Sequence, residues 1–143
     1  MRVGDAGFNL IRDFEGLRVE AYKCPAGVWT IGYGHTGPDV YKGLRITPER
    51  ACRLLEQDLE KFETGVAEAL GGAPTTQNQF DALVSFAFNC GLGAFRKSAV
   101  LRLHRAGRYK LAAAALLLWV KGGGRTLPGL LRRRNAERRL YLT

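Results

Sequence analysis

Apolar residues near the amino terminus recur at the spacing of a helix. Those between positions 8 and 14 fall on one helical face. The pattern stops at Glu15, and the next residue, Gly16, readily adopts the left-handed conformation that ends a helix. We therefore expect a short helix with Glu15 at its carboxyl end, facing the segment that follows.

Residues 22–44 have the pattern of a small sheet. β-Branched and aromatic residues occupy positions 28–31, and glycines interrupt the segment at short intervals. Short strands separated by glycine turns predict a small antiparallel sheet. The glycines are Gly27, Gly32, Gly34, Gly37 and Gly43.

A long helix is predicted over residues 48–70. Thr47, Pro48 and Glu49 provide an N-cap, a first-turn proline and an early acid, in the order that starts a helix. Apolar residues then recur at helical spacing, and the segment 71–74 breaks the pattern with two glycines and a proline. The rest of the chain is predicted to be helical, divided by glycines at 91–93, 107 and 122–124.

These elements predict an α+β protein with a single domain, residues 1–143. A sheet-bearing lobe spans about 15–47 in this prediction, and a connecting helix spans about 48–70. A helical lobe follows over about 71–143 and includes the first helix.

The composition is that of a folded globular protein. Of its 143 residues, 46% are hydrophobic and 24% are charged, which excludes intrinsic disorder and fibrous repeats. The longest apolar run, residues 111–120, has about half of the ~20 residues needed to span a bilayer. No secretory signal is visible at the amino terminus. We therefore expect no stable membrane anchor.

The cysteines indicate reduced thiols. Cys24, Cys52 and Cys90 are odd in number and widely spaced, which fits neither a disulfide framework nor a CxxC motif. The chain has two histidines, so no zinc set is expected. Cys52 and Cys90 lie among apolar residues and are expected to pack as small hydrophobes.

Positive charge is concentrated in the second half of the chain. Residues 1–70 hold 9 Lys and Arg against 11 Asp and Glu, a net charge of −2, whereas residues 71–143 hold 13 against 2, a net charge of +11. Such a surface attracts polyanions: nucleic acid, an anionic membrane or an anionic wall polymer. No zinc-finger or RNA-binding pattern accompanies the charge, so nucleic acid is not an expected partner.

Three residues around the predicted sheet could perform glycoside hydrolysis. That reaction needs a carboxylic acid to protonate the leaving oxygen and a second group to act as base or nucleophile at the anomeric carbon. Glu15 suits the first role, since partial burial favours the protonated form of a carboxyl. Cys24 and Thr30 follow at short spacing. Taken alone, the three also fit a helix-end acid, a small sheet-edge hydrophobe and a strand threonine.

The spacing of Glu15, Cys24 and Thr30 resembles the Glu, Asp-or-Cys, Thr signature of the phage-type lysozymes, the endolysin muramidases. Here Cys24 stands where aspartate is commoner. Other stretches resemble the family in the same order, which is not expected by chance. The matching stretches are Phe14–Arg18, Tyr22–Lys23, Thr30–Thr36, Thr76–Phe86, Phe88–Gly91 with Gly93–Phe95, and Trp119 with Gly129–Leu130, Arg133–Arg134 and Glu137.

The resemblance implies a lysozyme-like fold with a cleft between two lobes. It implies hydrolysis of the β-1,4 bond between N-acetylmuramic acid and N-acetylglucosamine in peptidoglycan, without a metal or organic cofactor, and lysis of the host cell. Anionic envelope polymers would then be natural partners of the basic half. The resemblance also places the protein as a monomer in the host bacterial cytoplasm, acting in the periplasm and wall after release, with a Gram-negative host expected.

The resemblance also suggests supporting residues. Tyr22, Tyr33 and Asn89 would contact sugars along the cleft, although sheet packing explains the two tyrosines nearly as well. His35 is expected to be a structural hydrogen-bonder rather than a catalyst. One arginine of Arg133 and Arg134 would pair with Glu15. His104 has no supporting context.

Two roles are open for Cys24. It could attack the anomeric carbon, or it could deprotonate a water that Thr30 holds. The family's water-positioning threonine favours the second role. A nearby Glu15 carboxylate is expected to raise the pKa of the Cys24 thiol above its usual value.

Three other functions compete with this hypothesis. A lytic transglycosylase would need the acid but no water-positioning pair. A cationic membrane-active protein would lyse cells without catalysis. A catalytically inactive wall-binding module fits least, because Glu15 is present.

Overall fold

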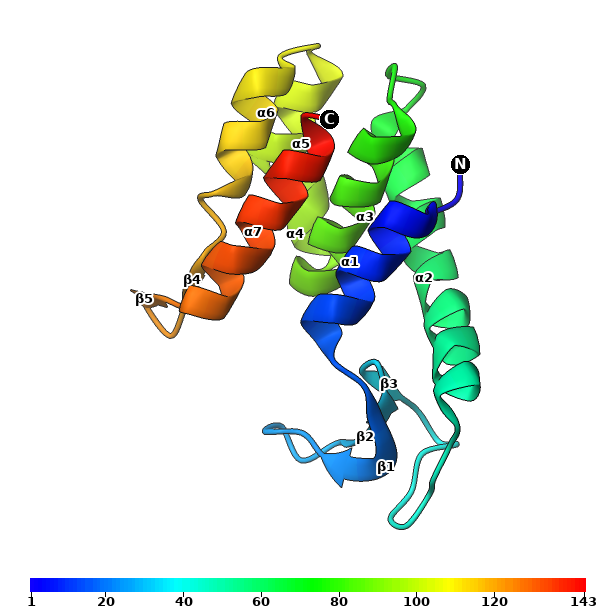
Figure 1. Cartoon of the computed structure of the whole chain (residues 1–143). Helices are drawn as coiled ribbons and strands as arrows, with labels where there is room; N and C mark the ends of the chain where they lie inside the picture. Colours follow the sequence, from blue (N-terminus) through cyan, green and yellow to red (C-terminus); the bar gives the residue numbers. More distant parts are fainter. The chain divides into compact units, whose positions relative to one another are not determined.

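The computed structural model describes all 143 residues. The chain forms two compact units: a sheet unit, Ile11–Lys61, and a helical unit, Met1–Leu10 with Phe62–Thr143. Helices α1 (Asp5–Glu15) and α2 (Pro48–Leu70) each contribute residues to both units (Figure 1). The division therefore falls within these helices, whereas the sequence predicted it at their ends.

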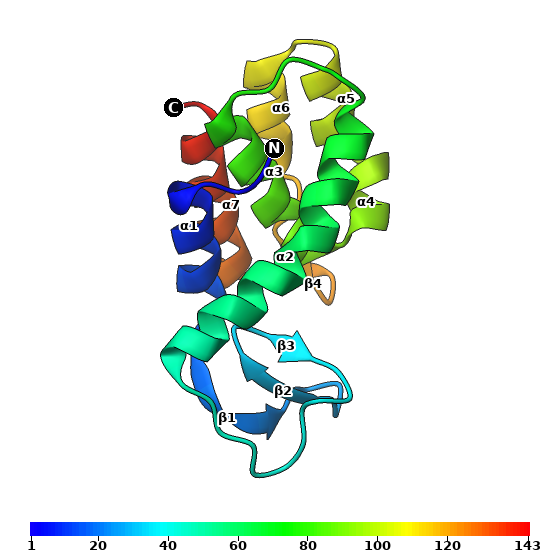
Figure 2. The same ribbon diagram turned by 90° about the vertical axis from the view of Figure 1, so that its right-hand side faces the viewer.

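The sheet unit contains the expected antiparallel sheet. Strands β1 (Arg18–Lys23), β2 (Trp29–Gly32) and β3 (His35–Thr36) lie in the order β1-β2-β3 (Figure 2). Thr30 is central, because it pairs with Tyr22 of β1 and with Thr36 of β3. A small apolar core holds the sheet against α2; its buried members are Ile31, Val40 and Leu54.

The predicted helix boundaries are confirmed by their caps. Gly16, at φ 76°, follows the last residue of α1. The Arg50 amide donates to Thr47 Oγ1 at 3.1 Å, and Pro48 opens α2. These contacts satisfy amide groups that the first turn of a helix leaves without a partner.

Helix α3 (Gln77–Cys90) is the centre of the helical unit. Nine consecutive residues, 79–87, are buried, which requires neighbours on every side of the helix. Thr76 begins it with a capping box to Gln79. The helices that complete the unit are α4 (Leu92–Lys97), α5 (Ala99–Arg105), α6 (Tyr109–Leu116) and α7 (Pro128–Tyr141).

One prediction for this unit is wrong. The sequence predicted only helices divided by glycine breaks, but around the break at residues 122–124 the strands β4 (Lys121–Gly122) and β5 (Arg125–Thr126) form a short antiparallel hairpin. Gly123 and Gly124, at φ 60° and 82°, make its turn. Two adjacent residues at positive φ are the requirement of a tight hairpin turn, which glycine meets without strain.

The two acids of the basic half are buried in structural roles. Asp81 on α3 accepts the Gly4 and Gly7 amides at 3.0 and 3.1 Å, which caps the start of α1. Glu137 on α7 is fully buried. Among the helices, none combines the length and apolar character needed to cross a bilayer.

Candidate active site

Glu15 occupies the last position of α1 and is half-buried. A Cβ built on Gly34, in the turn between β2 and β3, would lie 3.4 Å from Glu15 Oε1. Gly34 also has φ +88°. Glycine at this turn therefore lets the backbone run close beside the Glu15 carboxylate, at the edge of the sheet.

Cys24 lies in the loop that joins β1 to β2. Its amide donates to the Val28 carbonyl at 3.0 Å, and the Gly27 amide returns to the Cys24 carbonyl at 2.8 Å. The backbone groups of Val28 and Ala26 lower the pKa of the Cys24 thiol, helped by the Thr30 side chain. The expected rise in this pKa is therefore wrong, because hydrogen-bond donors around the sulfur outweigh the effects that oppose ionisation.

Thr30 is buried on β2. It is 4% exposed, and its Oγ1 donates to the Val28 carbonyl at 3.0 Å. The Thr30 side chain also helps to lower the pKa of the Cys24 thiol, so the two residues lie near each other. Glu15 lies beside the Gly34 turn, at the other end of β2.

The two tyrosines occupy different parts of the sheet. Tyr22 pairs with Thr30 across the strands, and the Arg18 guanidinium lies 4.1 Å from the centre of its ring. One ring face is therefore covered by a cation. Tyr33 is half-buried in the β2–β3 turn. Sugar contacts for both tyrosines stay predictions.

His35 joins three parts of the sheet unit. Its Nδ1 lies 2.9 Å from an Asp58 oxygen on α2, and its Nε2 lies 3.0 Å from an Asp39 oxygen. Burial alone would lower the pKa of His35, but the two carboxylates outweigh it and raise the pKa. These contacts support the structural role that the sequence predicted.

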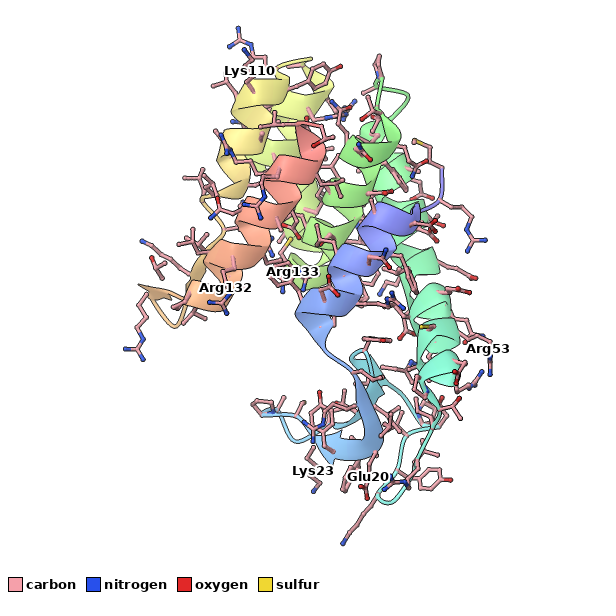
Figure 3. All side chains as sticks on the ribbon, viewed as in Figure 1. Glu20, Lys23, Arg53, Lys110, Arg132 and Arg133 are labelled. Atoms are coloured by element: carbon pink, nitrogen blue, oxygen red, sulfur yellow. The ribbon has the colours of Figure 1, made fainter.

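Arg133 and Arg134 converge on one carboxylate in the helical unit. Arg133 Nε donates to Glu137 Oε2 at 3.3 Å, and Arg134 Nε lies 3.2 Å from Glu137 Oε1. Ser85 donates to Glu137 Oε2 at 2.5 Å. Figure 3 shows Arg132 and Arg133 leaving α7 in different directions, and only Arg132 is exposed. The pairing of an arginine with Glu15 stays a prediction.

The buried side chains of Arg133, Arg134 and Glu137 together comprise two cations and one carboxylate. Burial raises the pKa of Glu137 and lowers the pKa of Arg134, while each charge opposes the other's shift. The Arg134 guanidinium also lies 5.0 Å from the centre of the Phe86 ring. An aromatic face attracts such a cation and compensates for part of its lost hydration.

Asn89 lies at the carboxyl end of α3, where its side-chain oxygen accepts a hydrogen bond from Arg134. Asn89 and Arg134 line a cavity of about 430 Å³ together with Trp119 and Lys121. A cavity with an amide, a cation and an aromatic ring offers the contacts that an acetamido sugar uses. Cys90 also lines it, but burial raises the pKa of that thiol to about 11.

A family model described as phage lysozyme matches residues 12–137. The chain belongs to the phage lysozyme family. It is 41% identical to the endolysin of Salmonella phage P22 over 147 residues, which cover 100% of this chain and 99% of that protein. It is 48% identical to the endolysin of Bacillus phage B103, covering 100% of this chain but only 55% of that relative, so the chain spans about half its length.

Solved structures confirm the lysozyme-like α+β fold. The muramidase domain of SpmX from Asticaccaulis excentricus superposes with a TM-score of 0.92 at 45% identity, over 99% of this chain and 98% of that one. The predicted fold class of this phage lysozyme family member is therefore confirmed.

Glu137 and Ser85 have structural roles that the sequence analysis missed. Arg133, Arg134 and Glu137 are three and four positions apart on one helix, a spacing that places their side chains together. Glu137 is also one of only two acids after residue 70. That spacing could have revealed the cluster, whereas Ser85, 52 residues away, gave no signal.

No group of three or more His, Cys, Asp or Glu side chains is arranged to hold a metal ion. All three cysteines are free thiols. Arg12 Nη1 contacts Cys52 Sγ at 3.5 Å, which links α1 to α2 in the sheet unit. Cys52 thus has a polar partner and is not the purely apolar packing group that the sequence predicted.

Proposed function

We propose that this phage lysozyme family member is an endolysin that hydrolyses the β-1,4 bond between N-acetylmuramic acid and N-acetylglucosamine. Glu15 is the general acid, Cys24 the base and Thr30 the residue that positions the attacking water. The observations that support this assignment are the place of Glu15 beside the Gly34 turn and, in the same unit, a Cys24 thiol whose pKa is lowered by Val28, Ala26 and Thr30. Host lysis and action at the wall after release are part of the proposal.

In this mechanism Glu15 gives its proton to the glycosidic oxygen as the bond to the anomeric carbon breaks. A water attacks that carbon from the opposite side, and the Cys24 thiolate takes one proton from it. The products are a sugar with a new hydroxyl at the anomeric carbon and a free hydroxyl on the leaving sugar. Glu15 is then ionised and Cys24 protonated, and exchange with solvent restores both.

The lowered pKa of Cys24 supports the role of a base. A thiol with its ordinary pKa is mostly protonated near neutral pH. Donors at Val28, Ala26 and Thr30 enlarge the thiolate fraction. Direct attack by the same thiolate is the competing role, and Thr30 favours water because a water needs a hydrogen-bonding partner.

Substrate contacts in the helical unit are part of the proposal. The cavity beside Asn89 is suited to an acetamido group, for which Asn89 and Lys121 offer polar contacts. Asn89 is held in place by Arg134. The exposed positive charge of residues 71–143 would favour adsorption to an anionic envelope at low salt and would lose that effect as salt screens it.

Purified peptidoglycan digested by variants tests the residue roles. Glu15→Gln and Cys24→Ala should each lose most activity, and Cys24→Asp should retain it because aspartate supplies a base of similar reach. Glu20→Gln and Cys52→Ala are matched controls, since Glu20 is an exposed acid on β1 and Cys52 is a second free thiol of the sheet unit. Full activity of Cys24→Ala would remove Cys24 from the mechanism.

A further inference from the structure

The longest stretch of the chain without an acidic residue lies in the helical unit. Residues 82–136 contain eleven Lys and Arg and no Asp or Glu. The acids that flank this stretch, Asp81 and Glu137, are 1% and 0% exposed and are bonded to their own structural partners. The exposed charge of this stretch is therefore entirely positive.

Four of these cations surround one hollow. Arg96 and Lys97 end α4, and Arg102 and Arg105 lie three positions apart on α5. Together with Ser98 and Leu101 they line a cavity of about 400 Å³. Helices α4 and α5 are consecutive and in contact, on one side of the helical unit (Figure 2).

None of these four side chains has a hydrogen-bond or ion-pair partner in the protein. Some cations elsewhere are paired: Arg45 lies 3.0 Å from Glu20, and Arg133 and Arg134 lie 3.3 and 3.2 Å from Glu137. Like charges held around one hollow repel one another. An anion bound between them would remove that repulsion.

We propose that this hollow, the α4–α5 cation site, binds the phosphate groups of a soluble bisphosphate. Three arginines offer planar forks that match phosphate oxygens, and the lysine adds a fourth charge. A phosphate monoester carries about −1.5 to −2 near neutral pH, so four cations balance two such groups. The site takes no part in the hydrolysis proposed above, and neither proposal depends on the other.

The hollow exposes too little apolar surface to be a site that binds a lipid bilayer. Leu101 is its one large apolar side chain, and it is only 5% exposed. A surface that enters a lipid interface presents exposed apolar side chains among its cations. A phosphate group that enters the hollow from solution needs no exposed apolar side chains around it.

Titration calorimetry and amide NMR on the full chain test this proposal. Glucose 1,6-bisphosphate is the probe, and glucarate, a dicarboxylate on a similar carbon skeleton, is its comparison. We expect one bisphosphate per chain, amide shifts confined to residues around 96–105, and glucarate binding at least about tenfold weaker. The double variant Arg102→Gln/Arg105→Gln should weaken bisphosphate binding at least about tenfold.

Arg125→Gln/Arg132→Gln is the matched control, because it removes the same charge from exposed positions outside the hollow. It should change the affinity less than about twofold. If both double variants weakened bisphosphate binding equally, net charge would explain the binding and the proposed site would be overturned. Glucarate binding as tight as that of the bisphosphate, or binding only to phosphatidylglycerol vesicles, would overturn a soluble bisphosphate as the ligand. At a salt concentration that screens adsorption, peptidoglycan cleavage by Arg102→Gln/Arg105→Gln should be unchanged, so failure here leaves the hydrolase assignment intact.

Discussion

The Thr30 side chain helps to lower the pKa of the Cys24 thiol, which lies in the loop between β1 and β2. Thr30 has a single hydroxyl hydrogen, which points at the Val28 carbonyl at 3.0 Å. Donation to a thiolate requires that hydrogen to turn away from the carbonyl. The state of the thiol and the orientation of the hydroxyl are therefore coupled.

Thr30→Val tests this coupling. Valine keeps the volume and the β-propensity of threonine but removes the hydroxyl, so the pKa of the Cys24 thiol should rise and activity should fall about 10²-fold. The pH dependence of Cys24 alkylation measures the first effect, with Cys52 and Cys90 replaced by alanine. Thr36→Val, the same change at the exposed cross-strand neighbour, should alter neither quantity. An unchanged alkylation profile in Thr30→Val would refute the coupling.

Gly34→Ala should separate backbone strain from disturbance of Glu15. Alanine at φ +88° costs roughly 1–2 kcal/mol, and its Cβ would lie against the Glu15 carboxylate. Gly43 has φ +89° with nothing within 4 Å, so Gly43→Ala should cost a similar amount of stability. We expect activity to fall about tenfold or more in Gly34→Ala only, measured on peptidoglycan at a temperature where both variants are folded. Equal activity loss in the two would assign the effect to strain.

Glu137→Gln should strongly destabilise the protein. The substitution removes the buried carboxylate charge that Arg133 Nε and Arg134 Nε contact, a change that costs about 3–5 kcal/mol. Glu20→Gln breaks an exposed pair with Arg45 and should cost no more than about 1 kcal/mol. Urea unfolding of the two variants compares the costs. If both variants lost a similarly small amount of unfolding free energy, the buried cluster would contribute little to stability.

The two histidines should change stability with pH in opposite directions. Buried His104 lies 2.6 Å from the Tyr141 hydroxyl, and burial lowers its pKa. The contribution of His104 to the free energy of unfolding is present above about pH 6.5 and is lost as the pH falls. His35, whose pKa is raised, contributes fully below about pH 6.5 and loses that contribution as pH rises through its folded pKa.

Variants separate these two contributions. Between about pH 8 and 5, His104→Gln should lose less stability on acidification than the wild-type protein, and His35→Gln should lose more. Urea unfolding at both pH values measures the difference. The assignment fails if either variant keeps the wild-type dependence.

Local signals allowed much of the fold to be predicted. Gly16, Thr47 and Pro48 act within one helical turn of their own positions, so their sequence context was sufficient. The hairpin at residues 121–126 was missed because its strands are two residues long and carry no alternating pattern. The glycines in this segment indicated a break between helices, but they did not indicate that two strands pair there.

The electrostatics of the site could not be predicted in the same way. The pKa of Cys24 depends on backbone groups at Ala26 and Val28, whose directions are fixed only when the loop folds. The Ser85–Glu137 contact joins residues 52 positions apart. Sequence resemblance predicted the residues of the site, but the direction of the charge effects depends on how the loop folds.

The end groups released from peptidoglycan in ¹⁸O-labelled water test the central claim most directly. A hydrolase that uses Glu15 and a Cys24-activated water adds the solvent oxygen to the product, so the account predicts reducing muramic acid ends that carry the label. Mass spectrometry should detect them with the wild-type protein and Cys24→Asp, and not with Glu15→Gln or Cys24→Ala. Anhydro ends without label, or labelled ends from Cys24→Ala, would contradict the account.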